Sequence, residues 1–282
     1  MKVYINGEFV DEKHASVSAF DTSFLYGEGL FETMRAYGGH IFALEDHLKR
    51  LTDSARVLEI KNAPDKERLA DACNKTLDAN KLVDARVRLT LTRGPVGSNN
   101  PTVVITATQY DGYDKAFYEK GMSAIVLASY RISNSPIASI KSTSYLPSVL
   151  ARRRAKAAGC NEAILLNEQG NITEGSYTNV FAIREDKIYT PPVVDGLLPG
   201  IMRNLVIKTA GKAGYLVLQR SISMRELQGM EELFLTNTLM QVMPLTRLNG
   251  KPVGDGKPGP ITKNMMELVS KEIMAATSGA GL

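Results

Sequence analysis

The sequence predicts an α+β protein of two domains, in which sheets and helices are interleaved without a regular β-α-β alternation. Asn6-Gly7 stands between two short strand-like runs and favours a two-residue hairpin turn. Residues 44–58 repeat apolar side chains at helical spacing, whereas residues 86–93 alternate every second position. Hairpins and period-two strands beside amphipathic helices indicate antiparallel sheet with a helical layer, and a doubly wound parallel sheet is not expected.

The first half is expected to form one sheet covered by two helices. Strands are predicted at 2–5, 8–10, 86–93 and 102–108, and helices at 44–58 and 66–82. A polar, tyrosine-bearing stretch with weak periodicity follows at 109–121. We therefore predict an N-terminal domain at 1–112 and a linker at 113–120.

The second domain is predicted at 121–282. Its strands are expected at 124–130, 163–166, 176–183, 188–190, 232–236 and 243–248. One helix is predicted from Pro147 to a stop at Gly159, a second at 201–213 after Pro199-Gly200, and a third at 261–276.

Charge and composition exclude several classes of function. The net charge of +4 comes from 34 basic and 30 acidic residues, without the concentrated basic stripe of a nucleic-acid-binding protein. Cys73 and Cys160 cannot build a disulfide framework, and the histidines lack metal-site spacing. The first residues do not resemble a signal peptide, and no apolar run reaches the roughly 20 residues that span a bilayer. We expect a cytoplasmic protein that binds no metal, nucleic acid or membrane.

Lys141 is the first candidate for chemistry. In SPIASIKSTSYLP it lies between an apolar, strand-like run and a predicted helix. Burial and the positive end of a helix both disfavour the ammonium ion, so they would lower the pKa of the lysine and make its amine a nucleophile that forms Schiff bases. Lysines before helices are common, and this segment alone leaves an ordinary surface lysine open.

Two further segments carry polar groups that could bind a ligand. Glu174 lies in GNITEGSYTNVF, where its carboxylate could hold a proton on a pyridine nitrogen or serve as a plain strand-edge acid. The segment GLLPGIMR, 196–203, places unpaired amides at a helix start. Such an end suits a phosphate, although an ordinary helix start looks the same.

Together these segments resemble the class IV aminotransferases, the fold-type IV enzymes that use pyridoxal 5′-phosphate. The likeness covers nearly the whole chain, through YGEGLFETMR, IKSTSYLP, GNITEGSYTNVF, GLLPGIMR and FLTNTLMQVMPL in that order. The resemblance implies two α+β domains with the cofactor in the cleft between them, usually in a homodimer. It also implies ping-pong transamination between an amino acid or amine and a 2-keto acid.

The same resemblance assigns roles to individual residues. Lys141 would be the catalytic Schiff-base lysine. The cofactor-binding residues it implies are Lys141, Glu174 at the pyridine nitrogen, Tyr145 at the ring oxygen, and Arg56, Ile201, Met202 and Thr238 at the phosphate. The substrate-binding residues it implies are Tyr26, Phe31, Arg35, Arg86, Arg88 and Leu239.

Substrate choice is less clearly marked. Phe31-Glu32-Thr33 departs from the Phe-Glu-Gly of branched-chain aminotransferases. This stretch, with 85–89 and 237–244, resembles the 4-amino-4-deoxychorismate lyases of the family, which eliminate pyruvate and give p-aminobenzoate. We predict a transaminase, with the lyase as the alternative. A non-catalytic module of the same fold is disfavoured, because Lys141, Glu174 and Arg56 are all present.

Overall fold

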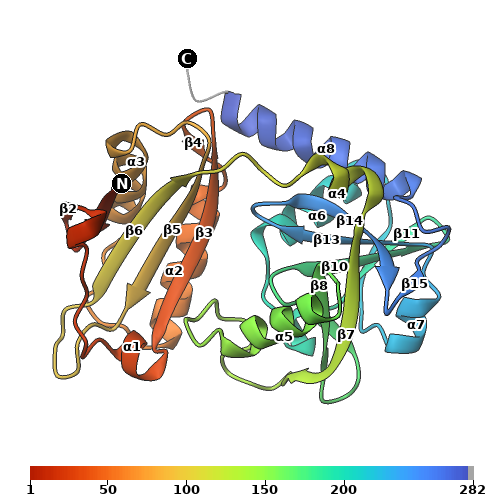
Figure 1. Cartoon of the computed structure of the whole chain (residues 1–282), viewed down its shortest axis with the longest axis horizontal. Coiled ribbons are helices and arrows are strands. Elements are labelled where there is room, and N and C mark those ends of the chain that lie inside the picture. Colours follow the sequence, from red (N-terminus) through yellow and green to blue (C-terminus); the bar gives the residue numbers. More distant parts are fainter. Residues whose placement is uncertain (279–282) are drawn as a thin grey trace. The chain divides into compact units, whose positions relative to one another are not determined.

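The computed structural model describes residues 1–278, which fall into two compact units (Figure 1). The first unit comprises Met1–Asp111, Ile140–Tyr145 and the residues from Met274 onward, and the second comprises Gly112–Ser139 and Leu146–Ile273. These boundaries differ from the predicted domains, because the segment around Lys141 belongs to the first unit. The predicted linker at 113–120 contains a helix, α4 (Lys115–Lys120), in the second unit.

The first unit is built on a sheet with the strand order β2-β1-β6-β5-β3-β4. Its strands are β1 (Lys2–Ile5), β2 (Glu8–Asp11), β3 (Gly29–Tyr37), β4 (His40–Ile41), β5 (Ala85–Thr92) and β6 (Thr102–Gln109). Its helices are α1 (Thr22–Tyr26), α2 (Leu44–Val57) and α3 (Lys66–Ala79), with a 3-10 turn at Glu12–His14. The predicted hairpin at Asn6-Gly7 is confirmed, because Ile5 pairs with Glu8 and both turn residues have positive φ.

Helices α2 and α3 cover one face of this sheet (Figure 1). They contribute the buried side chains of Leu48, Leu51, Ala55, Leu69, Cys73 and Leu77. From β5, Val87, Leu89 and Leu91 face the same core. Because successive strand residues point to opposite faces, Arg86 and Arg88 lie on the face away from the helices.

Strand β3 was not predicted. Its core-facing positions are Leu30, Glu32, Met34 and Ala36, all buried. A carboxylate in that row interrupts the apolar alternation by which a strand is recognised. Glu32 is tolerated there because partners from α2 bind it, and those partners are distant in the sequence.

The second unit contains a mixed sheet with the order β12-β11-β10-β13-β14-β7-β8-β9, and β15 pairs with β14. Its strands are β7 (Met122–Arg131), β8 (Glu162–Asn167), β9 (Ile172–Gly175), β10 (Asn179–Arg184), β11 (Lys187–Thr190), β12 (Val217–Gln219), β13 (Glu232–Asn237), β14 (Gln241–Leu248) and β15 (Lys251–Pro252). Beside α4, its helices are α5 (Leu146–Ala157), α6 (Ile201–Lys212), α7 (Met224–Gln228) and most of α8 (Pro260–Ser278), with a 3-10 turn at Val193–Asp195.

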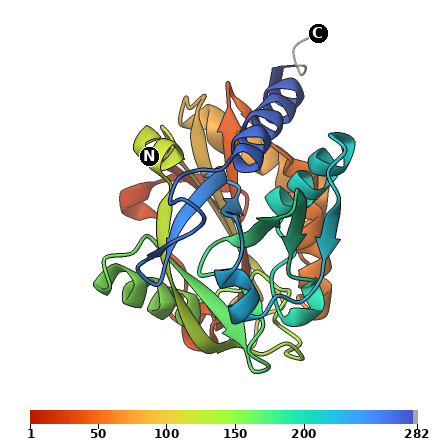
Figure 2. The ribbon, with the colours of Figure 1, turned by 90° about the vertical axis from the view of Figure 1, so that its right-hand side faces the viewer.

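Strand β8 is buried along its whole length, because it has a core on each face. Ala163 and Leu165 pack against α5, while Ile164 and Leu166 join the larger cluster of this unit. Figure 2 shows α5, in green, alongside β7. The small residues on α5 that meet β8 are Ala151 and Ala155.

The predicted α5 and its end at Gly159 are confirmed, with φ of 71° at the glycine. The apolar run before Lys141 is not strand-like, because its backbone turns. The Ala138 amide donates to the Ser135 carbonyl at 3.0 Å, and Ile137 is 46% exposed. Within residues 1–278, none of the helices combines the length and the apolar character needed to cross a membrane.

Candidate active site

Lys141 is fixed to the edge of β3. The Phe31 amide donates to the Lys141 carbonyl at 2.9 Å, and the Thr143 amide donates to the Gly29 carbonyl at 2.8 Å. This edge is available because β4 pairs only with the far end of β3. Helix α5 begins at Leu146, close to the predicted start at Pro147, so Lys141 itself lies outside the helix. Its backbone position comes from the first unit's sheet.

The Lys141 side chain lies among aromatic rings. Its Nζ is 4.6 Å from the centre of the Phe31 ring and 5.9 Å from that of Tyr145. The two rings meet edge to face, with their centres 5.3 Å apart. The guanidinium of Arg88 lies 4.0 Å from the Phe31 ring centre. The structure therefore brings together Lys141, Tyr145, Phe31 and Arg88 from the predicted set.

Arg86 and Arg88 come from alternate positions of β5, as predicted. Burial lowers the pKa of Arg88, and the Arg86 charge lowers it further, while Tyr145 opposes both. Arg35 pairs with Arg86 across β3 and β5. Its guanidinium lies 4.5 Å from the Tyr37 ring centre. Three predicted substrate arginines thus share one face of the sheet, away from α2 and α3.

Tyr26 is the remaining predicted substrate residue of the first unit. It is the last residue of α1 and is 72% exposed. Gly27 follows as the C-cap of α1 with φ of 70°.

A buried charged cluster was missed by sequence reasoning. His47 Nδ1 lies 2.7 Å from Glu32 Oε2, and Arg50 donates to both oxygens of Glu32, at 2.8 and 2.6 Å. Burial raises the pKa of Glu32, but Arg50 and His47 outweigh it and lower the pKa to about 2. Burial lowers the pKa of His47, Glu32 opposes this, and the positive charge of Lys141 adds to the lowering. The cluster is therefore within electrostatic range of Lys141.

Arg56, predicted at the phosphate, lies on the outer face of α2. Its Nη1 is 2.6 Å from Asp53, and its side chain is 78% exposed. The side chain of Arg50 is only 12% exposed. Helical spacing places Arg50 one turn from both His47 and Ser54, and the structure buries these two residues. The role predicted for Arg56 stays a prediction.

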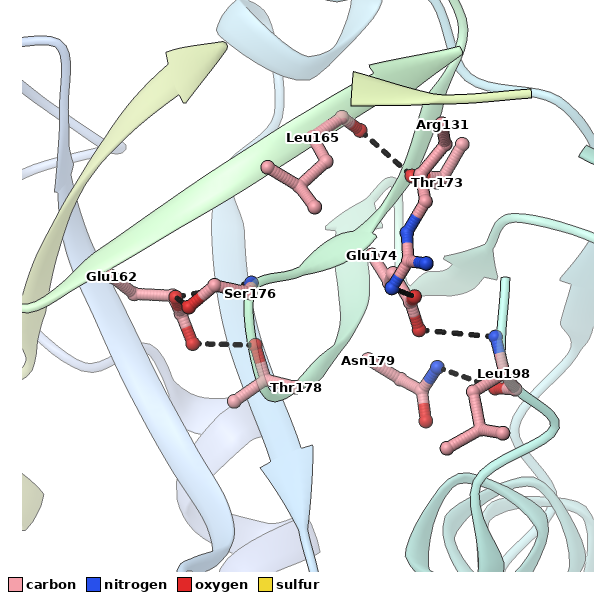
Figure 3. Close-up of polar contacts among 9 residues, drawn as sticks. All are labelled: Arg131, Glu162, Leu165, Thr173, Glu174, Ser176, Thr178, Asn179 and Leu198. Carbon is pink, nitrogen blue, oxygen red and sulfur yellow. Dashed lines mark hydrogen bonds and ion pairs between the residues drawn. The ribbon is translucent and has the colours of Figure 1, made fainter. Parts of the chain in front are cut away.

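Glu174 lies on β9 in the second unit and is nearly buried (Figure 3). Its Oε2 accepts from the Leu198 amide at 3.0 Å, and its Oε1 pairs with Arg131, the last residue of β7. Arg131 was not predicted, because it is 43 residues from Glu174 in the sequence. The carboxylate is thus held by a cation and a backbone amide.

The loop before α6 is fixed by the same strands. Asn179 Nδ2 donates to the Leu198 carbonyl at 2.9 Å, so Glu174 and Asn179 together hold both sides of Leu198. Gly200 is the N-cap of α6 and gives the helix no side-chain cap. A Cβ on Gly200 would lie 2.1 Å from Asn179 Oδ1. The first amides of α6, at Ile201 and Met202, thus lack a side-chain cap and suit an anion.

Thr238 and Leu239 lie in the turn between β13 and β14, and both are half-buried. Asn237 Oδ1 accepts from the Leu239 and Met240 amides, each at 2.9 Å, and so fixes the turn. Across residues 1–278, no three side chains of His, Cys, Asp or Glu gather in a way that could hold a metal ion.

The chain matches the family model for amino-transferase class IV over residues 29–248. It is 38% identical to a putative branched-chain-amino-acid aminotransferase of Methanocaldococcus jannaschii, over 95% of this chain and 94% of the relative. It is 31% identical to the D-alanine aminotransferase of Staphylococcus haemolyticus, over 98% of this chain and 99% of the relative.

Solved structures show the same fold. The Escherichia coli branched-chain amino acid aminotransferase aligns with a TM-score of 0.92 at 28% identity, over 99% of this chain and 97% of the other. A T.th. branched-chain amino acid aminotransferase, complexed with N-(5′-phosphopyridoxyl)-L-glutamate, aligns with a TM-score of 0.89 at 29% identity, over 99% of this chain and 95% of the other. A putative 4-amino-4-deoxychorismate lyase of Legionella pneumophila aligns with a TM-score of 0.85 at 26% identity, over 93% of this chain and 97% of the other.

These likenesses confirm the predicted fold, resemblance and transaminase activity, and they do not favour the lyase alternative. The chain belongs to the class IV aminotransferases and is an aminotransferase of that family.

Proposed function

We propose that the protein moves an amino group between an amino acid and a 2-keto acid with pyridoxal 5′-phosphate as its cofactor. The observation that carries this proposal is the setting of Lys141, an amine anchored to a sheet edge with Nζ 4.6 Å from the Phe31 ring centre. The T.th. relative complexed with a phosphopyridoxyl adduct supports the choice of cofactor.

The residues present fit this cofactor. When bound, pyridoxal phosphate supplies an aldehyde that forms an imine with an amine and a ring that stores an electron pair. Lys141 would hold it covalently, and Tyr145 would bind the ring oxygen. Glu174, already held by Arg131 and the Leu198 amide, would accept a hydrogen bond from the pyridine nitrogen and so keep that nitrogen protonated. The amides of Ile201 and Met202 and the hydroxyl of Thr238 would bind the phosphate.

Lys141 also acts on the substrate. With the cofactor bound, the Lys141 Nζ would take the α-proton of the substrate and later return a proton, so one atom would be first general base and then general acid. Phe31 and Tyr145 border Nζ and limit the water around it.

Two arginines of α2 are candidates for the phosphate charge. Arg56 is exposed and paired with Asp53. Arg50 is largely buried, in a cluster within electrostatic range of Lys141. Because a charge acts more strongly where water is excluded, we propose Arg50 in place of Arg56.

The substrate carboxylate is proposed to bind Arg86 or Arg88, with Arg35 further along the same face. Arg88 is the better placed, because it shares the Phe31 ring with Lys141. Phe31, Tyr26 and Leu239 are proposed to contact the substrate side chain. The named relatives act on branched-chain amino acids and D-alanine, and we propose one of these classes as the amino donor.

A homodimer is proposed from an apolar patch of the first unit. Phe20, Phe24 and Tyr26 are 70%, 75% and 72% exposed. Val96 is 57% exposed, and its amide donates to the Phe20 carbonyl at 2.9 Å. Contiguous exposed apolar side chains mark protein interfaces. A cytoplasmic location is proposed because Cys73 and Cys160 are both free.

Borohydride reduction tests the role of Lys141. The purified protein, loaded with pyridoxal phosphate and reduced, should carry the adduct on Lys141 in a peptide map. Lys141→Ala should carry none there and should lose turnover, whereas Lys156→Ala, at an exposed position of α5, should behave as wild type. An adduct on another lysine contradicts the proposed role.

Product analysis tests the reaction. Amino transfer is followed from leucine, glutamate and both alanine enantiomers to keto acids, beside release of p-aminobenzoate from aminodeoxychorismate. We expect amino transfer from at least one donor. Release of p-aminobenzoate without any amino transfer would reverse the assignment.

A further inference from the structure

Glu162, a carboxylate outside the predicted site, holds the turn between β9 and β10. It is 1% exposed. Its Oε1 accepts from the Ala163 amide at 2.8 Å, from the Ser176 amide at 3.1 Å and from the Ser176 hydroxyl. Its Oε2 accepts from the Thr178 hydroxyl at 3.1 Å (Figure 3). Uncharged donors therefore satisfy this buried carboxylate.

The turn packs directly on Glu162. The Gly175 amide donates to the Thr178 carbonyl at 2.6 Å, which closes the turn. A Cβ on Gly175 would lie 2.0 Å from Thr178 Oγ1 and 3.1 Å from Glu162 Cδ, so there is no room for a side chain. Glu162 and the turn are therefore in close contact, and we expect the loss of a hydrogen bond between them to shift the turn.

The turn separates two residues that hold Leu198, in the loop before α6, by its amide and its carbonyl. Glu174 precedes the turn and accepts from the Leu198 amide at 3.0 Å. Asn179 follows the turn and donates to the Leu198 carbonyl at 2.9 Å. Figure 3 shows both side chains pointing to Leu198. Because Glu174 and Asn179 flank the turn, its geometry sets their spacing.

We propose that Glu162 is a positioning residue that aligns two parts of the cofactor site through this single turn. One part is the Glu174 carboxylate, and the other is the Leu198–Gly200 loop that leads to the first amides of α6. The inference rests on the proposed function, which assigns both parts to one ligand. Glu162 itself contacts neither substrate nor cofactor and acts through Ser176 and Thr178.

The test uses two substitutions of Thr178 and a matched control. Thr178→Val keeps the shape but loses the hydroxyl that binds Glu162, and Thr178→Ser keeps the hydroxyl. Thr173→Val is the control, because Thr173 is 0% exposed, precedes Glu174 and donates to the Leu165 carbonyl at 3.0 Å rather than to Glu162 (Figure 3). Pyridoxal phosphate affinity is measured by fluorescence titration of each full-length protein, and the thermal unfolding midpoint is measured beside it.

Thr178→Val should weaken pyridoxal phosphate binding about tenfold, the factor expected for one lost hydrogen bond to a charged group. Thr178→Ser and Thr173→Val should bind within about twofold of wild type, although both valine variants lower the unfolding midpoint. A purely structural role would lower the midpoint and leave the affinity unchanged. Equal affinity of Thr178→Val and Thr173→Val would therefore overturn the inference.

Glu162→Gln provides a second variant if Thr178→Val does not fold. Its amide oxygen can keep the backbone donors on Oε1, while its NH2 reverses the bond to the Thr178 hydroxyl and the variant lacks the negative charge that this hydroxyl binds. It should also weaken pyridoxal phosphate binding, and wild-type affinity in this variant would overturn the inference. Failure of the wild-type protein to bind pyridoxal phosphate would instead contradict the proposed function.

Discussion

The guanidinium of Arg131 pairs with the carboxylate of Glu174, and this ion pair joins the end of β7 to β9. The Glu174 side chain is 6% exposed, so its charge depends on this partner and on the Leu198 amide. Arg131 and the Leu198 amide therefore orient the carboxylate proposed for the pyridine nitrogen.

Removal of Arg131 should destabilise the protein. Arg131→Met removes the cation that pairs with the buried Glu174 carboxylate, and we expect a loss of about 2–3 kcal/mol in the free energy of unfolding, reduced because Arg131 is partly exposed. Urea unfolding at pH 7 measures it. Arg220→Met, which removes an exposed pair with Glu226, should cost less than about 1 kcal/mol. Equal losses in the two variants would contradict the prediction.

The cluster of Glu32, His47 and Arg50 should make the free energy of unfolding depend on pH in the acidic range. The pKa of Glu32 is lowered to about 2 from an unfolded value of 4.5, so its stabilisation is complete above pH 4.5 and is lost as the pH falls toward 2. The full effect is about 3 kcal/mol. The lowered pKa of His47 acts in the same direction below pH 6.5, because the unfolded state binds that proton more readily.

Glu32→Gln is the check on this pH dependence. The unfolding free energy of wild type and variant is measured from pH 7 to pH 3. The wild-type advantage should be largest at the upper end and should shrink below pH 4.5. A constant difference between the two proteins across this range would show that Glu32 does not carry the effect.

Substitution by alanine should have opposite effects on stability at two glycines, Gly200 before α6 and Gly211 within it. Gly200→Ala forces Asn179 Oδ1 to move and so breaks its bond to Leu198, at a cost of about 1–2 kcal/mol. It should also weaken pyridoxal phosphate binding. Gly211→Ala meets nothing within 4 Å and should stabilise α6 by up to about 1 kcal/mol. Thermal unfolding of both variants measures the change in stability, and fluorescence titration measures the affinity for pyridoxal phosphate.

Arg88 should contribute to substrate binding. Arg88→Gln removes the charge beside the Phe31 ring and should raise KM for the amino acid about tenfold or more, with a smaller change in kcat. Arg68→Gln, at an exposed position of α3, is the control. Steady-state kinetics separate the two constants. An unchanged KM in Arg88→Gln would remove this residue from the substrate site.

The sequence by itself determined the elements that carry local patterns. The hairpin at Asn6-Gly7, the amphipathic helix α2 and the stop at Gly159 follow from turn chemistry and periodicity, which act over a few residues. The motifs around Lys141 and Glu174 also identified the family, which the comparisons confirm.

Only the tertiary structure decided which distant groups meet. Lys141 hydrogen-bonds to the edge of β3, and Arg131 reaches Glu174 across 43 residues. Glu32 interrupts the apolar pattern of β3. It can be buried there because His47 and Arg50 of α2 compensate its charge. Burial of such polar groups becomes favourable only when folding supplies their partners, and no local pattern in the sequence encodes those partners.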